Sequence, residues 1–246
     1  MPHRRTRCPH EPFSRDGAAL IAVVVPVHNE EAYLAACLRS LAEASRCRRL
    51  NGEAVLLVVV LDSCTDGSAD IARGWGAKPL HLQACNVGAA RALGAQWALD
   101  RGARWLAFTD ADSVVAPDWL SAQLALGSDV VCGTVAVSHW GDYGEPMRRH
   151  YDGTYTDADG HQHIHGANLG VSAAAYRQAG GFQPLTSSED VALVRALQAG
   201  GATIAWSAAP RVTTSARRLY KAPLGFGATL QRIDAESRGV VAVDGP

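Results

Sequence analysis

The sequence predicts an α/β fold with a mixed, mostly parallel sheet flanked by helices, and three observations support this prediction. Up to residue 137, short apolar runs alternate with helical patterns, which is typical of βαβ units. Two of these runs end just before Asp62 and Asp110, where open sheets of this class bind ligands. Hydrophobic residues make up 48% of the chain and charged residues 19%, which is enough apolar material for a large core.

The expected elements of the first half follow in a regular order. A strand at 20–25 stops at Pro26, and a helix at 30–44 places Leu34, Leu38 and Leu41 on one face. The further elements are a strand at 54–61, a helix starting near Thr65 or Asp66 and reaching Arg73, a strand at 79–82, a helix at 88–100, a strand at 104–108, a helix from Pro117 and a strand at 129–137.

The second half is less regular. After residue 138 a Gly, His, Asp and Tyr-rich stretch indicates an irregular segment, of the kind that often carries specificity. Helices are expected near 173–178, 188–199 and 224–233, and a strand near 203–206. We expect a flexible leader at 1–17, a single domain at 18–235 and a tail at 236–246.

Charge and cysteine usage exclude several classes of protein. The net charge is −1, with 23 basic and 24 acidic residues, so nothing favours nucleic acid as a partner. The six cysteines form no CxxC pair, which favours a reducing cytoplasm. The apolar run 18–27 is too short to span a bilayer, so we expect no signal peptide or transmembrane helix.

Asp110 and Asp112, separated by one residue after the apolar run 104–108, are the most informative pair of acids in the chain. Two carboxylates at this spacing can share a divalent cation and the phosphates that it carries. A buried pair without such compensation would be costly. The pair therefore predicts a metal and phosphate site at the end of a strand.

Three other strand ends carry candidate binding residues, each with a simpler explanation. Pro26, Asn29 and Glu30 lie in a strand-to-helix turn that could hold a nucleoside, although Asn29 could merely cap the helix. Asp62 could accept from a base or ribose hydroxyl, although its segment could be a plain strand-to-helix turn in which Asp66 caps the helix. Arg91, in the helix opened by Asn86, could reach a pyrophosphate, although a solvated arginine is the default.

Two polar clusters of the second half allow both functional and structural interpretations. His161, His163 and His165 alternate as on one side of a strand; we expect one of them to line an acceptor pocket rather than all three to bind zinc. Asp190, with Glu189, could act as a general base for an incoming hydroxyl. A capping box of Thr186 with Glu189, or Ser187 with Asp190, would explain these acids equally well.

These motifs, in this order, resemble the family-2 glycosyltransferases with the GT-A (Rossmann-like) fold over about residues 20–230. The matching segments are Pro26 to Glu30, Asp62 to Ser68, Asp110 with Asp112, Gly166 to Leu169 followed by Gly180-Gly181-Phe182, and Glu189 with Asp190. The resemblance implies transfer of a sugar from a nucleoside diphosphate donor to a hydroxyl on a lipid, glycan or small molecule, with inversion. It divides the domain into a nucleotide-sugar-binding half, 18–137, and an acceptor-binding half, 138–235.

The resemblance also implies a role for each site residue. Asp62 would hold the nucleoside, Asp110 would contact the ribose or sugar, and Asp112 would ligate Mg²⁺ or Mn²⁺. Pro26, Asn29, Glu30 and Arg91 complete the expected donor side. Asp190 would take the proton of the acceptor hydroxyl, with Glu189, Asn168 and His165 on the acceptor side.

Two departures from the family pattern bear on this interpretation. Leu61 stands where many relatives have a second acid, and residues 213–218 lack the Gln-x-x-Arg-Trp signature of processive synthases, so we expect a non-processive hexosyltransferase. Basic and apolar residues near the C-terminus also leave peripheral contact with the inner face of a membrane open: Arg217, Arg218, Leu219, Lys221, Leu224 and Phe226.

Other functions remain as alternatives. Asp110 to Val114 fits the Asp-x-Asp-x-Thr/Val motif of haloacid-dehalogenase-like phosphatases, in which the first Asp is phosphorylated, but three strands precede it here. A pyrophosphorylase should have a Gly-rich basic loop after the first strand, and residues 25–31 have neither glycine nor lysine. A catalytically silent nucleotide-sugar-binding module would tolerate the loss of these acids, yet all are present.

Overall fold

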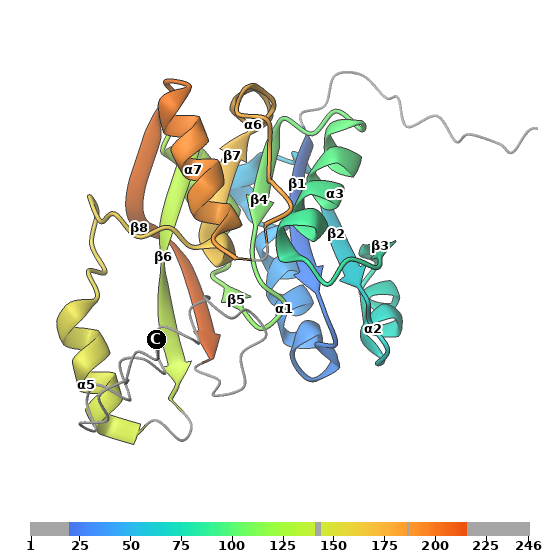
Figure 1. Cartoon of the computed structure of the whole chain (residues 1–246), viewed down its shortest axis with the longest axis horizontal. Helices are drawn as coiled ribbons and strands as arrows, with labels where there is room; N and C mark the ends of the chain where they lie inside the picture. The colour runs from blue at the N-terminus through green and yellow to red at the C-terminus, as the bar shows by residue number, and fades with distance from the viewer. Residues whose placement is uncertain (1–19, 141–143, 186, 216–246) are drawn as a thin grey trace, which may run out of the picture.

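The computed structural model describes residues 20–140, 144–185 and 187–215, in which eight strands form one sheet (Figure 1). The strand order is β3-β2-β1-β4-β7-β6-β8-β5. The strands are β1 (Leu20–Val27), β2 (Ala54–Asp62), β3 (Lys78–Leu82), β4 (Trp105–Phe108), β5 (Val114–Val115), β6 (Val130–His139), β7 (Leu169–Ser172) and β8 (Ile204–Ser215). Pairing is parallel from β3 to β4 and mixed beyond, which confirms the predicted fold class.

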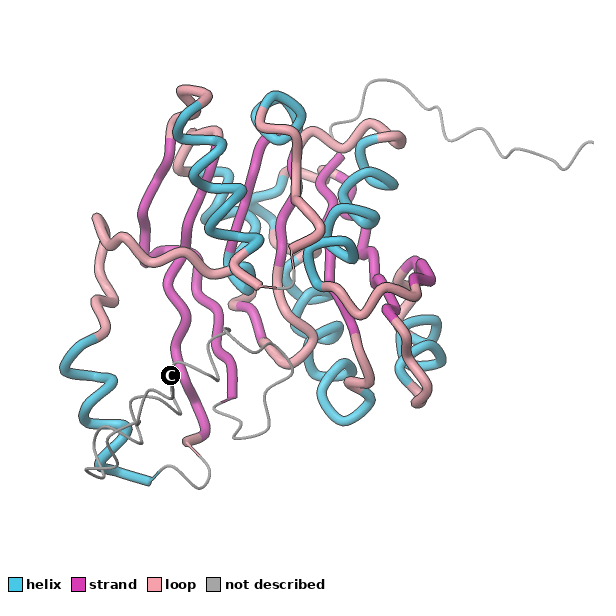
Figure 2. The backbone as a smooth tube through the Cα atoms, viewed as in Figure 1, coloured by secondary structure: helices cyan, strands magenta, loops and turns pink. Residues whose placement is uncertain are grey.

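Helices cover both faces of this sheet (Figure 2). They are α1 (Glu31–Ala44), α2 (Ser68–Gly74), α3 (Val87–Leu99), α4 (Trp119–Ala125), α5 (Gly144–Thr154), α6 (Ala173–Gln178) and α7 (Glu189–Ala199), with short 3₁₀ turns η1 (Arg48–Leu50) and η3 (Gly166–Asn168). Within the described residues, no helix is long and apolar enough to cross a membrane.

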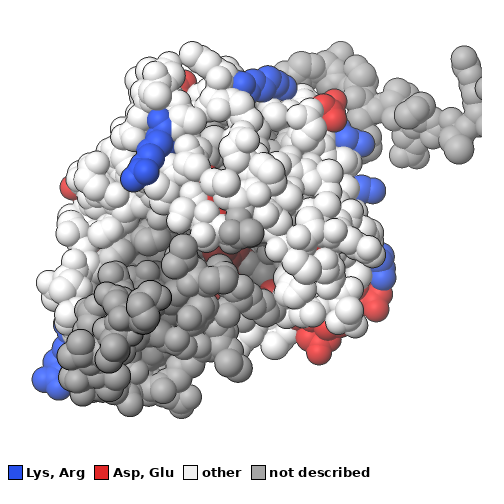
Figure 3. All heavy atoms as spheres, viewed as in Figure 1, with Lys and Arg blue, Asp and Glu red and all other residues white. Residues whose placement is uncertain are grey.

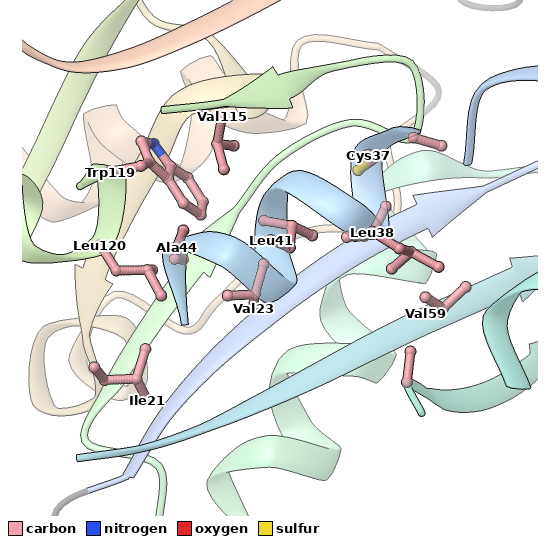
Figure 4. Close-up of a cluster of buried hydrophobic side chains, with 14 of the residues drawn as sticks. Ile21, Val23, Cys37, Leu38, Leu41, Ala44, Val59, Val115, Trp119 and Leu120 are labelled. Atoms are coloured by element: carbon pink, nitrogen blue, oxygen red, sulfur yellow. The ribbon is translucent and has the colours of Figure 1, made fainter. Parts of the chain in front are cut away.

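Alternation along β1 divides the core between the two faces. Ile21, Val23 and Val25 pack on one side with α1 and Trp119, as Figure 4 shows for part of this cluster. Ala22 and Val24 point to the other side, where α3, α6 and α7 pack. Because both faces of the strand are buried, its sequence is an almost continuous apolar run.

Most expected elements are present, and the differences have physical causes. The helix expected from Thr65 or Asp66 begins at Ser68, because Asp66 bonds the backbone of Glu31 as well as that of Ser68. The helix expected from Pro117 begins at Trp119. The strand expected at 203–206 continues to Ser215 along β6, past a register shift.

The segment expected to be irregular after residue 138 contains α5, whose Met147 and Tyr151 pack against Val137 and Trp140. Two strands, β5 and β7, were not expected. The predicted leader, the helix at 224–233, the basic and apolar residues 217–226 and the tail lie outside the described residues.

One edge of the sheet gathers the predicted motifs. Val27 of β1 pairs with Leu61 of β2, and Val24 pairs with Phe108 of β4, so these parallel strands end together. Antiparallel β7 begins at this edge, since its Leu169 pairs with Phe108. The segments that follow β1, β2 and β4, and the η3 turn that precedes β7, therefore meet there.

Candidate functional site

The loops after β1 and β2 are joined by hydrogen bonds between them. The Asn29 Oδ1 accepts from the backbone N of Thr65 at 2.7 Å, and the backbone N of Glu30 donates to the Ser68 Oγ at 3.1 Å. The backbone N of Gly67 donates to the Glu31 Oε2 at 2.7 Å. These contacts make the two loops one surface beside the strand ends.

Their residues differ in part from expectation. Asn29 is not the helix cap, since Glu30 holds that position. Asn29 has a left-handed backbone conformation, φ 53°, and its side-chain oxygen accepts a hydrogen bond from the neighbouring loop. Glu30 is buried. Pro26 lies within β1, opposite Val60 of β2, rather than in the turn.

Asp62 is buried and holds the loop before α3. Its Oδ1 accepts from the backbone N of Ala84 at 2.7 Å and of Cys85 at 2.9 Å, and its Oδ2 accepts from the backbone N of Asn86 at 2.7 Å. Burial alone would raise the pKa of Asp62, but these amides and the Ser63 hydroxyl bring it below its ordinary value. Asp62 therefore holds the β3–α3 loop in place through these hydrogen bonds, independently of any contact with a ligand.

Arg91 is a buried ionic link rather than a solvated side chain. It projects from α3, which Asn86 caps by accepting from the backbone N of Ala89 at 2.8 Å. Its side chain is 4% exposed. The Arg91 Nη2 donates to the Asp110 Oδ1 at 2.6 Å, and Nη1 donates to the Glu189 Oε1. Two carboxylates therefore occupy the Arg91 guanidinium, and its expected contact with a pyrophosphate stays a prediction.

Asp110 and Asp112 lie directly beyond β4, and they differ in their surroundings. The Asp110 side chain is 38% exposed but binds the buried Arg91. Burial raises the pKa of Asp110, and Asp112 and Asp190 act in the same direction, against the lowering effect of Arg91. The Asp112 Oδ1 lies 3.5 Å from the Ser113 Oγ. Asp110 is thus paired with a buried cation, while Asp112 and Asp190 disfavour its charged form.

Glu189 and Asp190 form the first turn of α7 and have separate partners. Glu189 is buried against Arg91, and burial raises the pKa of Glu189 despite that cation. The Asp190 Oδ2 accepts from the backbone N of Gly166 at 2.7 Å, and its Oδ1 accepts from the backbone N of Val191 at 2.8 Å. Asp110, which follows β4, and Glu189, at the start of α7, therefore share one guanidinium.

The capping explanation for these acids has limited support. The N-cap of α7 is Ser188, which makes no capping hydrogen bond through its side chain and has φ 58°. Thr186, one partner of the expected capping boxes, lies outside the described residues. The Asp190 Oδ1 does accept from one backbone N of the first turn, that of Val191. Its Oδ2, however, accepts from the backbone N of Gly166, in the segment before β7.

Asn168 is fully buried and holds strands together. Its Nδ2 donates to the carbonyl O of Thr134 at 2.7 Å and of Pro210 at 2.8 Å, and its Oδ1 accepts from the Trp119 Nε1 at 2.8 Å. Both hydrogens of the Asn168 amide nitrogen are thus used within the fold, and Asn168 supports the turn that carries Gly166. Its place on the acceptor side stays a prediction.

The three histidines form a ladder of rings in a loop rather than one side of a strand. Centroids of His161 and His163 lie 5.4 Å apart, those of His163 and His165 lie 5.9 Å apart, and Tyr155 stacks on His163 at 4.2 Å. Burial and His163 lower the pKa of His165 to about 4, despite Asp190. His165 is thus a neutral ring electrostatically coupled to Asp190.

The donor set fits a hard cation that arrives with a diphosphate. Among residues 20–140, 144–185 and 187–215, no group of three or more His, Cys, Asp or Glu side chains could hold a metal ion. Mg²⁺ is commonly held by one or two carboxylates together with substrate phosphates, and Asp110 and Asp112, one residue apart directly beyond β4, are carboxylates of this kind. The histidine ladder is no zinc site by the same criterion.

Several residues with a strained, left-handed backbone conformation also lie at this edge of the sheet. Of the five described non-glycine residues with positive φ, four lie in its loops: Asn29, Ser63, Cys85 and Ser188. Strained conformations of this kind persist where the surrounding structure holds them, often at functional sites. Figure 3 shows acidic atoms at the bottom of a hollow near the middle of the face in view.

Gly166 lies in a segment that the family resemblance placed on the acceptor side, but its contact with Arg91 was not expected. A Cβ on Gly166 would lie 2.5 Å from the Arg91 Cζ, so the glycine packs directly on the guanidinium. The only signal was the small-residue segment Gly166-Ala167 after the histidines. Nothing in that segment shows which side chain lies beneath it.

The model of a family described as glycosyl transferase family 2 matches residues 22–180. Over 146 residues the chain is 30% identical to the putative glycosyltransferase EpsH of Bacillus subtilis (strain 168), covering 56% of this chain and 39% of that protein.

Solved structures give a similar result for the fold. The crystal structure of S. aureus TarS 1-349 in complex with UDP-GlcNAc has a TM-score of 0.62 at 18% identity, covering 88% of this chain and 66% of that one. The crystal structure of S. aureus TarS also gives 0.62 at 18% identity, covering 89% of this chain and 43% of that one. The chain thus spans less than two thirds of each of these relatives, and the structural likeness concerns the fold.

Proposed function

Because this chain belongs to glycosyl transferase family 2, we propose that it transfers a sugar from a nucleoside diphosphate sugar to a hydroxyl acceptor, with inversion and with a divalent cation. The observation that supports this proposal is the gathering of Asp110, Glu189 and Asp190 around Arg91 and Gly166 at one sheet edge. An inverting transfer needs a donor side and a base on the opposite side of the reacting carbon, and these acids come from both halves of the chain.

Each residue has a task in the proposed reaction. Asp110 would contact the ribose or sugar, held in place by Arg91. Asp112 would hold Mg²⁺ or Mn²⁺, which when bound would offset the charge on the diphosphate. The loop that Asp62 organises would border the nucleoside. Asp190, with both oxygens oriented by backbone amides, would take the acceptor proton.

The further details are also proposals. A single transfer per encounter agrees with the missing Gln-x-x-Arg-Trp signature, and a cytoplasmic setting agrees with the cysteine pattern. The phosphatase alternative loses its support, because the family match covers the Asp110 segment. A silent nucleotide-sugar-binding module remains as an outcome of the test below.

The test measures release of nucleoside diphosphate from a panel of nucleotide sugars, with and without Mn²⁺. UDP-GlcNAc is the first donor to try, since the TarS 1-349 complex contains it. We expect release to need Mn²⁺ and Asp112→Asn to reduce both turnover and Mn²⁺ binding. The matched control is Asp118→Asn. Asp118 is a surface acid whose Oδ2 lies 3.7 Å from the Arg49 Nη1.

Asp190→Asn separates binding from catalysis. We expect this variant to bind donor and Mn²⁺ like the wild type while turnover falls by about 100-fold or more, the usual range for a general base. Donor binding without turnover in the wild type would support the silent module. An active protein that is indifferent to Mn²⁺ and to Asp112→Asn would contradict the metal-dependent mechanism.

A further inference from the structure

Gly166 lies against the face of the buried Arg91 guanidinium. A Cβ at this position would lie 2.5 Å from Cζ, 2.5 Å from Nη2 and 2.6 Å from Nη1 of Arg91. Nearly equal distances to three atoms of one plane mean that the Cβ would point onto the face of that plane. The guanidinium meanwhile binds Asp110 and Glu189 through its terminal nitrogens. No residue larger than glycine fits there while Arg91 keeps its place.

The same residue orients the proposed base. Its backbone N donates to the Asp190 Oδ2 at 2.7 Å, while the backbone N of Val191 donates to Oδ1 at 2.8 Å. Amides from two segments thus fix both oxygens of one carboxylate. Gly166 comes within hydrogen-bonding distance of Asp190 while no side chain separates it from the Arg91 guanidinium. The close contact with Arg91 and the hydrogen bond to Asp190 therefore depend on the same position of Gly166.

We propose that Gly166 is a positioning residue of the sugar transfer: its missing side chain lets its amide hold Asp190 at a set position relative to Asp110. This inference rests on the proposed function, in which Asp190 accepts the proton. The link runs from Asp110 through Arg91 to Gly166 and on to Asp190, and so joins donor and acceptor sides through a single buried cation.

Gly170 provides a matched control. A Cβ there would lie 2.5 Å from the Gln123 Oε1 and 2.6 Å from the Trp105 Cζ2, so this glycine is as crowded as Gly166. It lies within β7, where it pairs with Ala107 and Val131, and its crowding involves no acid of the site. Replacement by alanine should therefore disturb packing at Gly170 without misplacing the proposed base.

The kinetic test compares Gly166→Ala with Gly170→Ala in the full chain, using UDP-GlcNAc, Mn²⁺ and UDP release. We expect Gly166→Ala to lower kcat about 10- to 100-fold, as a misplacement near 1 Å can. Its KM for UDP-GlcNAc should stay within about twofold, because Asp110 and Glu189 both hold Arg91 and the segment of residue 166 should move away from it instead. Gly170→Ala should keep kcat near the wild-type value. Equal kcat losses in both variants would contradict the proposal.

A second comparison asks whether Gly166 acts through Asp190. Asp190→Asn and the double variant Gly166→Ala/Asp190→Asn should share the same kcat within about threefold, because a missing base gains nothing from orientation. Losses that multiply would mean that Gly166 acts elsewhere. A raised KM with unchanged kcat would likewise overturn the positioning role.

A double-mutant cycle that measures Tm needs no donor substrate. It also tests the proposal if the Gly166→Ala variant folds too poorly for kinetic measurements. Arg91→Met removes Cζ and both terminal nitrogens, the three atoms that the alanine methyl would meet. We therefore expect the Tm loss caused by Gly166→Ala to be much smaller in the Arg91→Met background than in the wild type. Equal losses would overturn the Gly166 inference alone. A wild type that turns over no nucleotide sugar, with the cycle as expected, would instead overturn the proposed function.

Discussion

Arg91 is the residue on which both acid pairs depend, and its environment predicts a large effect on stability. Removing one partner of a buried ion pair leaves the others desolvated and uncompensated, which typically costs about 3–5 kcal/mol. We expect a loss of this size for Arg91→Ala in the free energy of unfolding, measured by urea denaturation. Its two partners, Asp110 and Glu189, come from segments 79 residues apart along the chain.

Arg104 provides the control for Arg91. It makes two hydrogen bonds of 2.6 Å to Glu53, but its side chain is 47% exposed. Exposed pairs usually contribute about 0.2–1 kcal/mol, so Arg104→Ala should cost far less than Arg91→Ala. Similar losses for the two variants would mean that Arg91 is solvated in solution.

His165 predicts how stability depends on pH. Burial and His163 lower the pKa of His165 from 6.5 to about 4, so the unfolded chain binds more protons between these values. Stability should therefore fall as the pH is lowered through this range, by up to about 3 kcal/mol from this group. His165→Gln, which can still accept from the Tyr155 hydroxyl, should flatten that part of the urea-unfolding profile.

The comparison variant is His81→Gln, on an exposed part of β3. It should leave the slope between pH 4 and 6.5 as in the wild type. His163, whose pKa burial also lowers, stays in both variants and keeps part of the slope. An unchanged slope in His165→Gln would show that His165 titrates normally.

At the residue scale, sequence reasoning identified the acids but not their partners. Asp110, Glu189 and Asp190 could be found because acids directly after an apolar run or at a helix start are locally visible. Arg91 and Asn168 were expected on the donor and acceptor sides, but their contacts within the fold were not foreseen. Their partners lie 19 to 98 positions away along the chain, and no local pattern encodes such contacts.

At the scale of elements, the loops after β1 and β2 should behave as one unit. Asn29 supports this unit in two ways, through its left-handed backbone and through the hydrogen bond from the Thr65 amide. Asn51 has the same φ, 53°, at the end of η1 and serves as a control for backbone strain alone. Asn29→Ala should therefore cost about 1 kcal/mol more than Asn51→Ala, the usual contribution of one hydrogen bond.

Hydrogen exchange can check the joined loops directly. The Thr65 amide should be protected in the wild type and exchange faster in Asn29→Gly, which keeps the backbone conformation but removes the acceptor. The same amide in Asn51→Gly should exchange as in the wild type. Unchanged protection in Asn29→Gly would mean that the loops are held together by other contacts.

Elements with a distinct apolar run or helical pattern were predicted, whereas the short strands β5 and β7 were not. β1, β2 and α1 have apolar patterns that local periodicity detects. β7 has only four residues, Leu169–Ser172, with a glycine among them, and its place between β4 and β6 depends on long-range pairing. β8 is longer than expected because β6 provides a neighbour across a register shift, which its own sequence does not reveal.

At the scale of the whole molecule, the continuous sheet predicts that both halves unfold together. The donor-side strands end at β4, the acceptor side begins at β7, and four residue pairs join the two strands near the middle of the sheet. Arg91 adds a second link, since α3 belongs to one half and Glu189 of α7 to the other. A single domain over 18–235 remains a prediction from the sequence, and this topology favours it.

Urea unfolding followed by tryptophan fluorescence and by far-ultraviolet circular dichroism tests that prediction. Trp105 and Trp119 are buried in the core cluster beside α1, while Trp206 lies on β8 beyond the β4–β7 pairing, so fluorescence covers both halves. Because separating the halves would expose β4 and β7 edges together with the Arg91 ion pairs, we expect coincident transitions. Arg91→Ala weakens the link between α3 and α7 but leaves the β4–β7 pairing, so it should shift both transitions equally. Two separate transitions in the wild type would show instead that the acceptor half is an independent unit and that the base can move relative to the donor site.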